Sequence, residues 1–257
     1  MNRTGITERL VRFANILVGH LRGGLAHANI LASVFFAGMT GAAVSDTAAI
    51  GTMLIPAMEK DGYDLDFSAA VTAASSIIGP TIPPSNMMVI YGSLMNVSIA
   101  GLFAAGFIPG LLLAAFLMVI SGIISAKRGY PKSRRSTLKE MLIGFKDALI
   151  PLLMPIIILG GILSGIFTPT EAAAVAVAYA VIIGFFVLKS LSIRDIPEML
   201  IKTARITGVV FLIIGTASIL SWILSFAQVP QKIAPVSYTH LRAHATPEHL
   251  VCRLLLE

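Results

Sequence analysis

Sixty consecutive residues, from Phe67 to Ala126, contain no Asp, Glu, Lys or Arg. A single helix needs about 20 apolar residues to cross a bilayer, so this run is long enough for more than one crossing. The run is interrupted at residues 79–86 by the string GPTIPPSN. A membrane tolerates such a break only where protein or a water-filled cavity satisfies the freed backbone groups. The run therefore predicts a polytopic membrane protein with a binding site near the break.

The composition and charge of the chain agree with a membrane protein. The chain is 56% hydrophobic and only 12% charged, with a mean hydropathy of +0.87, outside the range of ordinary soluble domains. The net charge of +6 does not indicate nucleic-acid binding, because the basic residues lie between apolar runs and there act as topology signals. The single cysteine, Cys252, excludes an internal disulfide framework.

Charged residues divide the chain into apolar blocks and connecting segments. The densest basic cluster follows residue 126, and the positive-inside rule places it in the cytoplasm. The predicted fold is all-α. We expect, in order, an interfacial amphipathic arm (1–24), a re-entrant helical hairpin (25–58), a broken helix plus a transmembrane helix (67–126), a basic cytoplasmic loop (127–147), two transmembrane helices (148–188), an amphipathic connector (189–205) and a transmembrane helix (206–232).

The hairpin is predicted from the length of the first apolar block. Residues 25–58 are too many for one upright helix and too few for two full spans, and the small residues at 38–42 (GMTGA) weaken a helix at the centre. Each half of about 15 residues covers roughly 20 Å, short of the bilayer core of about 30 Å. We therefore expect a tip near mid-membrane, beside the break at 79–86. Broken helices expose half-helix termini that can hold anions and carbonyls that can hold Na⁺.

The candidate site residues lie at these two breaks. Hydroxyl, amide and carboxylate oxygens could bind Na⁺ there, aided by freed carbonyls. The candidates are Gly38, Thr40, Gly41, Ser45, Asp46, Thr47, Pro83, Ser85 and Asn86. Asp46 is the only charge in its block, so it either carries charge during transport or orders the tip through the helix dipole. The sequence favours the second role.

Other chemistry finds little support in the sequence. Residues 168–171 (TPTE) are typical of a helix-capping box with proline at the first helical position, so Glu171 is predicted to be structural. No nucleophile–base pair, phosphate loop or zinc spacing is recognisable, and no cofactor is expected. An intramembrane enzyme would need Asp46 and Glu171 in contact, because they are the only acids within the predicted spans.

Several uncommon strings, in order, carry a resemblance. GMTGAAVSDTAAIG at 38–51, LIPAM at 54–58, IGPTIPPS at 78–85, VIYG at 89–92 and GGILSGIFTPTEAAA at 160–174 resemble the DctM large membrane subunit of tripartite ATP-independent periplasmic (TRAP) transporters. The resemblance covers about residues 1–233. It implies an elevator-type, Na⁺-coupled transporter of C4-dicarboxylates, sialic acid or related organic acids in the bacterial inner membrane. It also implies two partners, a small DctQ-type membrane subunit and a periplasmic DctP-type binding protein. The alternative within transport is a cation/proton antiporter that shares hairpins and broken helices.

The sequence departs from this family in two respects. Large subunits of the family have further helices before the matching region and a second hairpin after it, so the chain is expected to be a middle fragment with half of the site. Residues 235–257 are polar and basic where the family continues into the membrane, and they resemble a stretch found on unrelated sequences. We therefore expect a foreign tail. Its His240, His244, His249 and Cys252 match no defined zinc spacing.

Overall fold

The computed structural model describes residues 6–188 and 191–233, and this part of the chain is helical without any strand. Five of its segments are long and apolar enough to cross a membrane, namely Leu65–Met95, Ile99–Arg128, Leu138–Leu163, Pro169–Val187 and Ile193–Phe226. The expectation of an all-α polytopic membrane protein is confirmed. The elements are α1 (Ile6–Val18), α2 (Gly24–Thr40), α3 (Ala43–Lys60), α4 (Leu65–Ser76), α5 (Ile78–Thr81), α6 (Asn86–Met95), α7 (Ile99–Arg128), α8 (Leu138–Leu163), α9 (Pro169–Ile182), the π-helical turn η2 (Ile183–Val187), the 3₁₀ turn η3 (Ile193–Asp195) and α10 (Ile196–Phe226).

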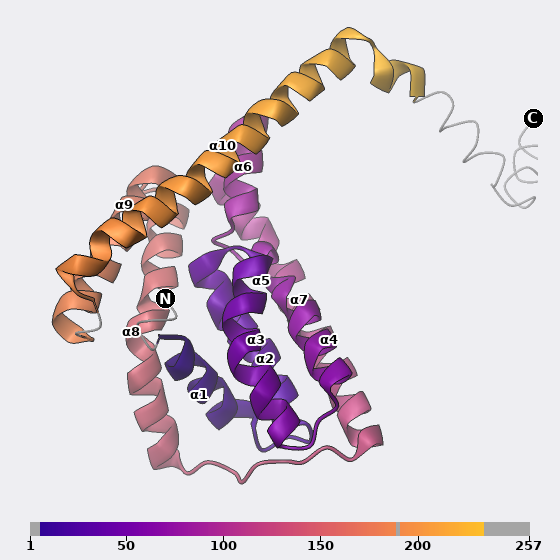
Figure 1. The fold of residues 1–257 in the computed structure, drawn as a ribbon, viewed down its shortest axis with the longest axis vertical. Helices are drawn as coiled ribbons and strands as arrows, with labels where there is room; N and C mark the ends of the chain where they lie inside the picture. Colours follow the sequence, from indigo (N-terminus) through magenta and orange to yellow (C-terminus); the bar gives the residue numbers. More distant parts are fainter. Residues whose placement is uncertain (1–5, 189–190, 234–257) are drawn as a thin grey trace, which may run out of the picture. The chain divides into compact units, whose positions relative to one another are not determined.

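Two compact units divide the chain at Ser192. In the first unit, α2 is the central helix, since it contacts α1, α3, α4, α5, α7 and α8, and Figure 1 shows α2 and α3 between α7 and α8. Helix α2 carries no charged residue, and most of its side chains are buried. Packing of this kind holds membrane helices together by van der Waals contact rather than by exclusion of water.

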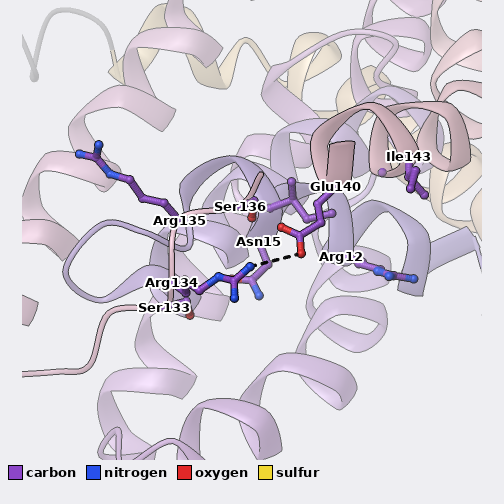
Figure 2. A pocket seen from close by; sticks show the side chains of 10 residues that line it. Arg12, Asn15, Ser133, Arg134, Arg135, Ser136, Glu140 and Ile143 are labelled. Atoms are coloured by element: carbon purple, nitrogen blue, oxygen red, sulfur yellow. Dashed lines mark ion pairs between the residues drawn. The ribbon is translucent and has the colours of Figure 1, made fainter. Parts of the chain in front are cut away.

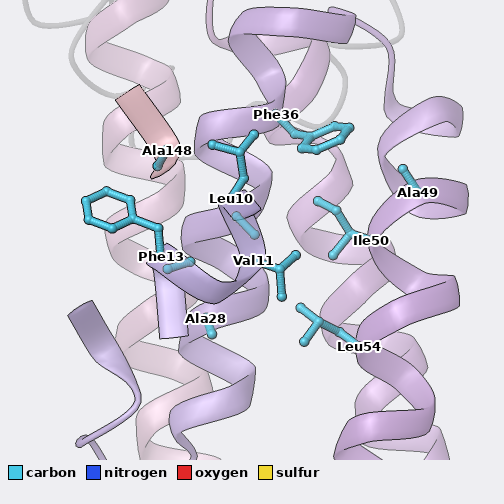
Figure 3. Close-up of a cluster of buried hydrophobic side chains, with 11 residues drawn as sticks. Leu10, Val11, Phe13, Ala28, Phe36, Ala49, Ile50, Leu54 and Ala148 are labelled. Carbon is cyan, nitrogen blue, oxygen red and sulfur yellow. The ribbon is translucent and has the colours of Figure 1, made fainter. Parts of the chain in front are cut away.

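The amphipathic arm lies against other helices in the structure. Residues 1–24 were expected to form an interfacial arm, and α1 does have one apolar face. That face is covered by α2, α3 and α8: Leu10 and Ala14 are fully buried in a cluster that includes Phe36 and Ala148. Figure 3 shows this cluster between the helices. Helix α1 is therefore a packed part of the first unit.

The two predicted helix breaks lie near the expected positions but are shorter. Helix α2 continues through Thr40 and ends at Gly41, after which α3 begins at Ala43. The second interruption covers residues 82–85, because Gly79 and Pro80 belong to the short helix α5. Pro80 is tolerated there because the first turn of a helix leaves backbone N–H groups without a partner.

Two predicted connecting segments are largely helical. The basic loop was expected at 127–147, but α7 continues through Arg128 and α8 begins at Leu138, where Thr137 and Glu140 form a capping box. The connector at 189–205 and the span at 206–232 were expected as separate elements, but α10 runs unbroken from Ile196 to Phe226. No residue from 198 to 207 is Gly or Pro, so nothing stops this helix. The predicted foreign tail and its histidines lie outside the described residues.

Candidate functional site

The two helix breaks meet in the structure. The side-chain amide of Asn86, the first residue of α6, donates a hydrogen bond to the carbonyl oxygen of Thr40 at the end of α2, over 3.3 Å. A Cβ placed on Gly41 would lie 2.8 Å from the carbonyl oxygen of Pro84 and 2.9 Å from the backbone nitrogen of Asn86. The hairpin tip and the proline-rich segment are therefore in direct backbone contact, so the tip lies beside the second break, as the sequence predicts.

Gly41 makes this contact possible for two reasons. Its φ of 58° lies in the left-handed region, which glycine adopts without steric cost. Its lack of a side chain also leaves room for the opposing backbone. In the same conformation, the N–H of Gly41 donates a hydrogen bond to the carbonyl oxygen of Ala37 and ends α2, in the manner of a left-handed C-cap.

Asp46 lies in the first turn of α3, directly behind the tip. Its side chain is fully buried, and Thr40 donates a hydrogen bond to one carboxylate oxygen, Oδ1, across the break. The other oxygen, Oδ2, has no hydrogen-bond partner within residues 6–188 and 191–233, and it faces Gly79 of α5, where a Cβ would collide with it. Among the described residues, no basic side chain pairs with Asp46. A buried carboxylate without full compensation is costly.

The helix ends around Asp46 add to the electrostatics of the tip. Helices α2 and α5 end there, at Thr40 and Thr81, and α3 and α6 begin there, at Ala43 and Asn86. The C-terminal ends of α2 and α5 present carbonyl oxygens, which suit cations. The N-terminal ends of α3 and α6 present N–H groups, which suit anions. Helix ends of both polarities therefore meet at the junction of the two breaks.

The remaining predicted site residues divide into two groups. Pro83 is fully buried, and Ser85 is buried and accepts a hydrogen bond from the backbone N–H of Met88, which caps α6. These two residues belong to the junction. Ser45 and Thr47 lie on the exposed side of α3, where the hydroxyl of Thr47 bonds the carbonyl of Ala43.

Gly38 is buried in the last turn of α2, and its Cβ position faces α8. A Cβ at this position would lie 2.7 Å from Cβ of Pro155 in α8. Gly38 therefore lets α2 approach α8 closely, and the structure does not bring it to the junction.

A second buried polar group joins α2 to α4 and was not predicted. The amide of Asn29 donates to the hydroxyl of Thr72 over 2.7 Å and accepts from Ser75 over 3.2 Å, and Ser33 donates to Ser75 over 3.0 Å. These side chains are at most 1% exposed. The sequence signal for this contact was the pair Asn29 and Ser33, two polar residues about one helical turn apart in a mostly apolar helix. Gly79 was also missed as a neighbour of Asp46.

The structure gives no support to the enzyme alternative. The Glu171 carboxylate accepts hydrogen bonds from the backbone and hydroxyl of Thr168 at the start of α9. No contact joins it to Asp46 in the part of the chain that the structure describes. Within the same residues, no cluster of three or more His, Cys, Asp or Glu could hold a metal ion.

These features define a multi-pass membrane protein whose interrupted helices meet around one buried acid. The sequence model of the family described as "Tripartite ATP-independent periplasmic transporter, DctM component" matches residues 1–247. The chain belongs to this DctM family. The family match extends into the stretch that the sequence predicted to be foreign.

Relatives in this family are named as permeases. The chain is 46% identical over 236 residues to the sialic acid TRAP transporter permease protein SiaT of Haemophilus influenzae, covering 92% of this chain and 38% of SiaT. It is 46% identical over 234 residues to the large permease protein SiaM of Vibrio cholerae, and 40% identical over 234 residues to the C4-dicarboxylate large permease protein DctM of Pseudomonas aeruginosa. Each of these two alignments covers 91% of this chain and 55% of the relative. The chain thus spans about half the length of such relatives or less.

Proposed function

We propose that this chain forms part of the large permease of a TRAP-type transporter in the bacterial inner membrane. The permease imports an organic acid, such as sialic acid or a C4-dicarboxylate, together with Na⁺. Its partners are a small DctQ-type membrane subunit and a periplasmic DctP-type binding protein. The proposal is supported by membership of the DctM family and by the names of the relatives. Sialic acid is the first substrate to test, because the two permeases at 46% identity are named for it.

We further propose that the junction of the two breaks is a half-site for the coupling Na⁺. The observation that carries this proposal is the buried Oδ2 of Asp46, which finds no hydrogen-bond partner in the described part of the chain. Na⁺ prefers oxygen ligands, and unwound backbone with freed carbonyls is how broken-helix transporters coordinate it. Thr40 can contribute both its hydroxyl and its carbonyl, because these groups flank the break.

Burial changes the balance between the two roles of Asp46. The sequence favours a role in ordering the tip. The hydrogen bond from Thr40 fits that role, because it joins the two sides of the tip. Ordering alone would leave one carboxylate oxygen buried and uncompensated, which is costly in a membrane interior. A bound cation removes that cost. A proton would remove it as well, so proton coupling is the second candidate.

The test uses a chimera in which residues 6–233 replace the matching segment of the Haemophilus influenzae permease. The chimera is reconstituted in liposomes with the other components of that system. Asp46→Asn keeps the shape and removes the charge, so the Na⁺ concentration for half-maximal uptake should rise about tenfold or more, equivalent to about 1.4 kcal/mol. Asp61→Asn, at an exposed acid beyond α3, is the control and should leave it unchanged.

Two results would redirect the proposal. Uptake by Asp46→Asn with unaltered Na⁺ dependence would return Asp46 to a tip-ordering role. Uptake by the unmodified chimera that follows a proton gradient and ignores Na⁺ would favour the proton as coupling ion. Ser85→Ala is a poorer test of ion binding, because it also removes the N-cap of α6, which is worth about 1 kcal/mol.

A further inference from the structure

A polar hollow of about 400 Å³ lies away from the junction, between α1, the segment before α8 and the first turns of α8. Its lining includes Arg12, Ser133, Arg134, Arg135, Ser136 and Glu140. Figure 2 shows Arg134 directed toward Glu140, while the guanidinium groups of Arg12 and Arg135 extend outward to either side. The transport proposal assigns no role to these residues.

The charges of the hollow do not cancel. The lining holds three guanidinium groups and one carboxylate, so it carries a net charge of +2. The Glu140 carboxylate is already engaged, since it accepts a 2.7 Å hydrogen bond from the backbone N–H of Thr137, and its ion pair with Arg134 is long at 3.8 Å. Arg12 and Arg135 make no hydrogen bond or ion pair among the described residues. Two cationic groups are therefore free to bind an anion.

The hollow is held open by contacts of the segment between α7 and α8. The backbone N–H of Ser133 bonds the carbonyl of Gly19 over 2.9 Å, and Gly23 bonds the carbonyl of Pro131 over 3.1 Å. On the other side, α1 is fixed to α8 by contacts of Phe13 with Phe145 and of Ile16 with the Gly144 position. The walls of the hollow are therefore fixed before a ligand binds, and only the arginine side chains need to be ordered on binding.

An apolar surface begins directly beside the hollow. Leu138, Leu142 and Phe145 on the first turns of α8 are 80%, 69% and 48% exposed. Helix α8 is one of the segments long and apolar enough to cross the membrane, and these side chains lie at the end of it that follows the basic segment. The basic segment before α8 indicates the cytoplasmic side. A ligand with an anionic head and apolar chains matches both parts of this surface.

We propose that the hollow binds the phosphate of an anionic phospholipid of the cytoplasmic leaflet. Arg134 lies at the phosphate position, and the side chains of Arg12 and Arg135, which no ion pair holds among the described residues, turn inward to bind it. Guanidinium groups bind phosphate through paired, charge-assisted hydrogen bonds. The hydroxyls of Ser133 and Ser136 reach the same group, and the acyl chains lie along the exposed face of α8. Basic pockets beside transmembrane helices bind anionic headgroups in this way. The proposal depends on the membrane location of the chain and not on transport.

The test measures lipid binding to the purified full chain in detergent by native mass spectrometry. The probes are phosphatidylglycerol, phosphatidylcholine with the same acyl chains, and inorganic phosphate. Each arginine near an anionic headgroup contributes a factor of about 5 in affinity. Arg12→Gln combined with Arg135→Gln should therefore weaken phosphatidylglycerol binding about 30-fold. The matched control, Lys202→Gln with Arg205→Gln in α10, removes the same amount of charge elsewhere. It should change the affinity for phosphatidylglycerol by less than about 2-fold.

Several results would overturn the proposal. One is equal binding of phosphatidylglycerol and phosphatidylcholine to the unmodified chain, and another is an equal effect of the test and control pairs. Displacement of phosphatidylglycerol by millimolar inorganic phosphate would assign the hollow to a soluble anion. If the double variant does not retain its helical content, Arg135→Gln is measured alone, and an unchanged affinity in place of the expected loss of about 5-fold contradicts the proposal.

Discussion

Replacing Gly41 by alanine tests whether the two breaks are in contact. Gly41 and Gly129 are a matched pair, because each ends a helix in the left-handed conformation, with φ of 58° and 70°. Each also donates its N–H to the carbonyl four residues earlier. A Cβ at Gly129 meets nothing within 4 Å, whereas at Gly41 it meets the backbone of Pro84, Ser85 and Asn86 at 2.8–3.1 Å. The two substitutions therefore differ chiefly in the contact across the junction.

The expected magnitudes follow from these geometries. Alanine in the left-handed conformation costs about 1–2 kcal/mol at either position. At Gly41 the added methyl group must also push backbone away, and overpacking of this kind costs about 1–3 kcal/mol. Gly41→Ala should therefore lower the free energy of unfolding by about 2–5 kcal/mol, and Gly129→Ala by only about 1–2 kcal/mol.

The assay is equilibrium unfolding of the full chain in mild detergent by added sodium dodecyl sulfate, followed by far-ultraviolet circular dichroism. The quantity of interest is the difference between the two variants, because the conformational cost cancels. Equal destabilisation by Gly41→Ala and Gly129→Ala would refute the reasoning, since it would mean that the Pro84–Asn86 backbone does not approach the tip in solution.

The remaining predictions concern the buried amide and the end of α7. Asn29→Ala and Thr72→Val should show a coupling free energy of about 0.5–1.5 kcal/mol in a double-mutant cycle, as interhelical hydrogen bonds in membranes do; additive effects would show that the bond contributes nothing. At the end of α7, hydrogen bonds from Tyr130 and Arg128 lower the pKa of Asp64, so their stabilisation is present above the unfolded pKa of about 3.9 and is lost as pH falls through the folded value. The melting temperature of Tyr130→Phe should lie below that of the unmodified chain at pH 7, and the two should converge below about pH 4; a constant gap would exclude this linkage.

The breaks could be predicted from the sequence because their signals are local. The proline-rich string at 79–86 cannot form a regular helix, and the small residues at 38–42 shorten the hairpin arms. The limits of the breaks could not be predicted, because Thr40 stays helical only with the left-handed cap at Gly41. Residues 138–147 were likewise assigned to a loop because of their charges, although the capping box at Thr137 starts a helix there.

The composition of the candidate site depended on contacts that no local pattern contains. Ser45 and Asp46 are adjacent in the sequence, yet one is exposed and the other fully buried, because a helix turns successive side chains by about 100°. The approach of Gly79 to Asp46 joins residues from separate helices. The buried bond between Asn29 and Thr72 spans 43 positions, and only the packing of α2 on α4 brings its two ends together.

The unbroken helix α10 has a consequence for how deeply it can sit in a bilayer. Its uncharged part, residues 206–226, is about 32 Å long and matches a hydrocarbon core of about 30 Å. The charged residues Glu198, Lys202 and Arg205 then emerge as a rigid extension of about 15 Å.

Moving α10 by one turn, about 5.4 Å, would draw Arg205 toward the hydrocarbon, at a cost of up to about 3 kcal/mol. Moving it the opposite way would expose Phe226 to water, at a cost of about 2–3 kcal/mol. A shift of α10 along the membrane normal is therefore opposed from both ends of the helix.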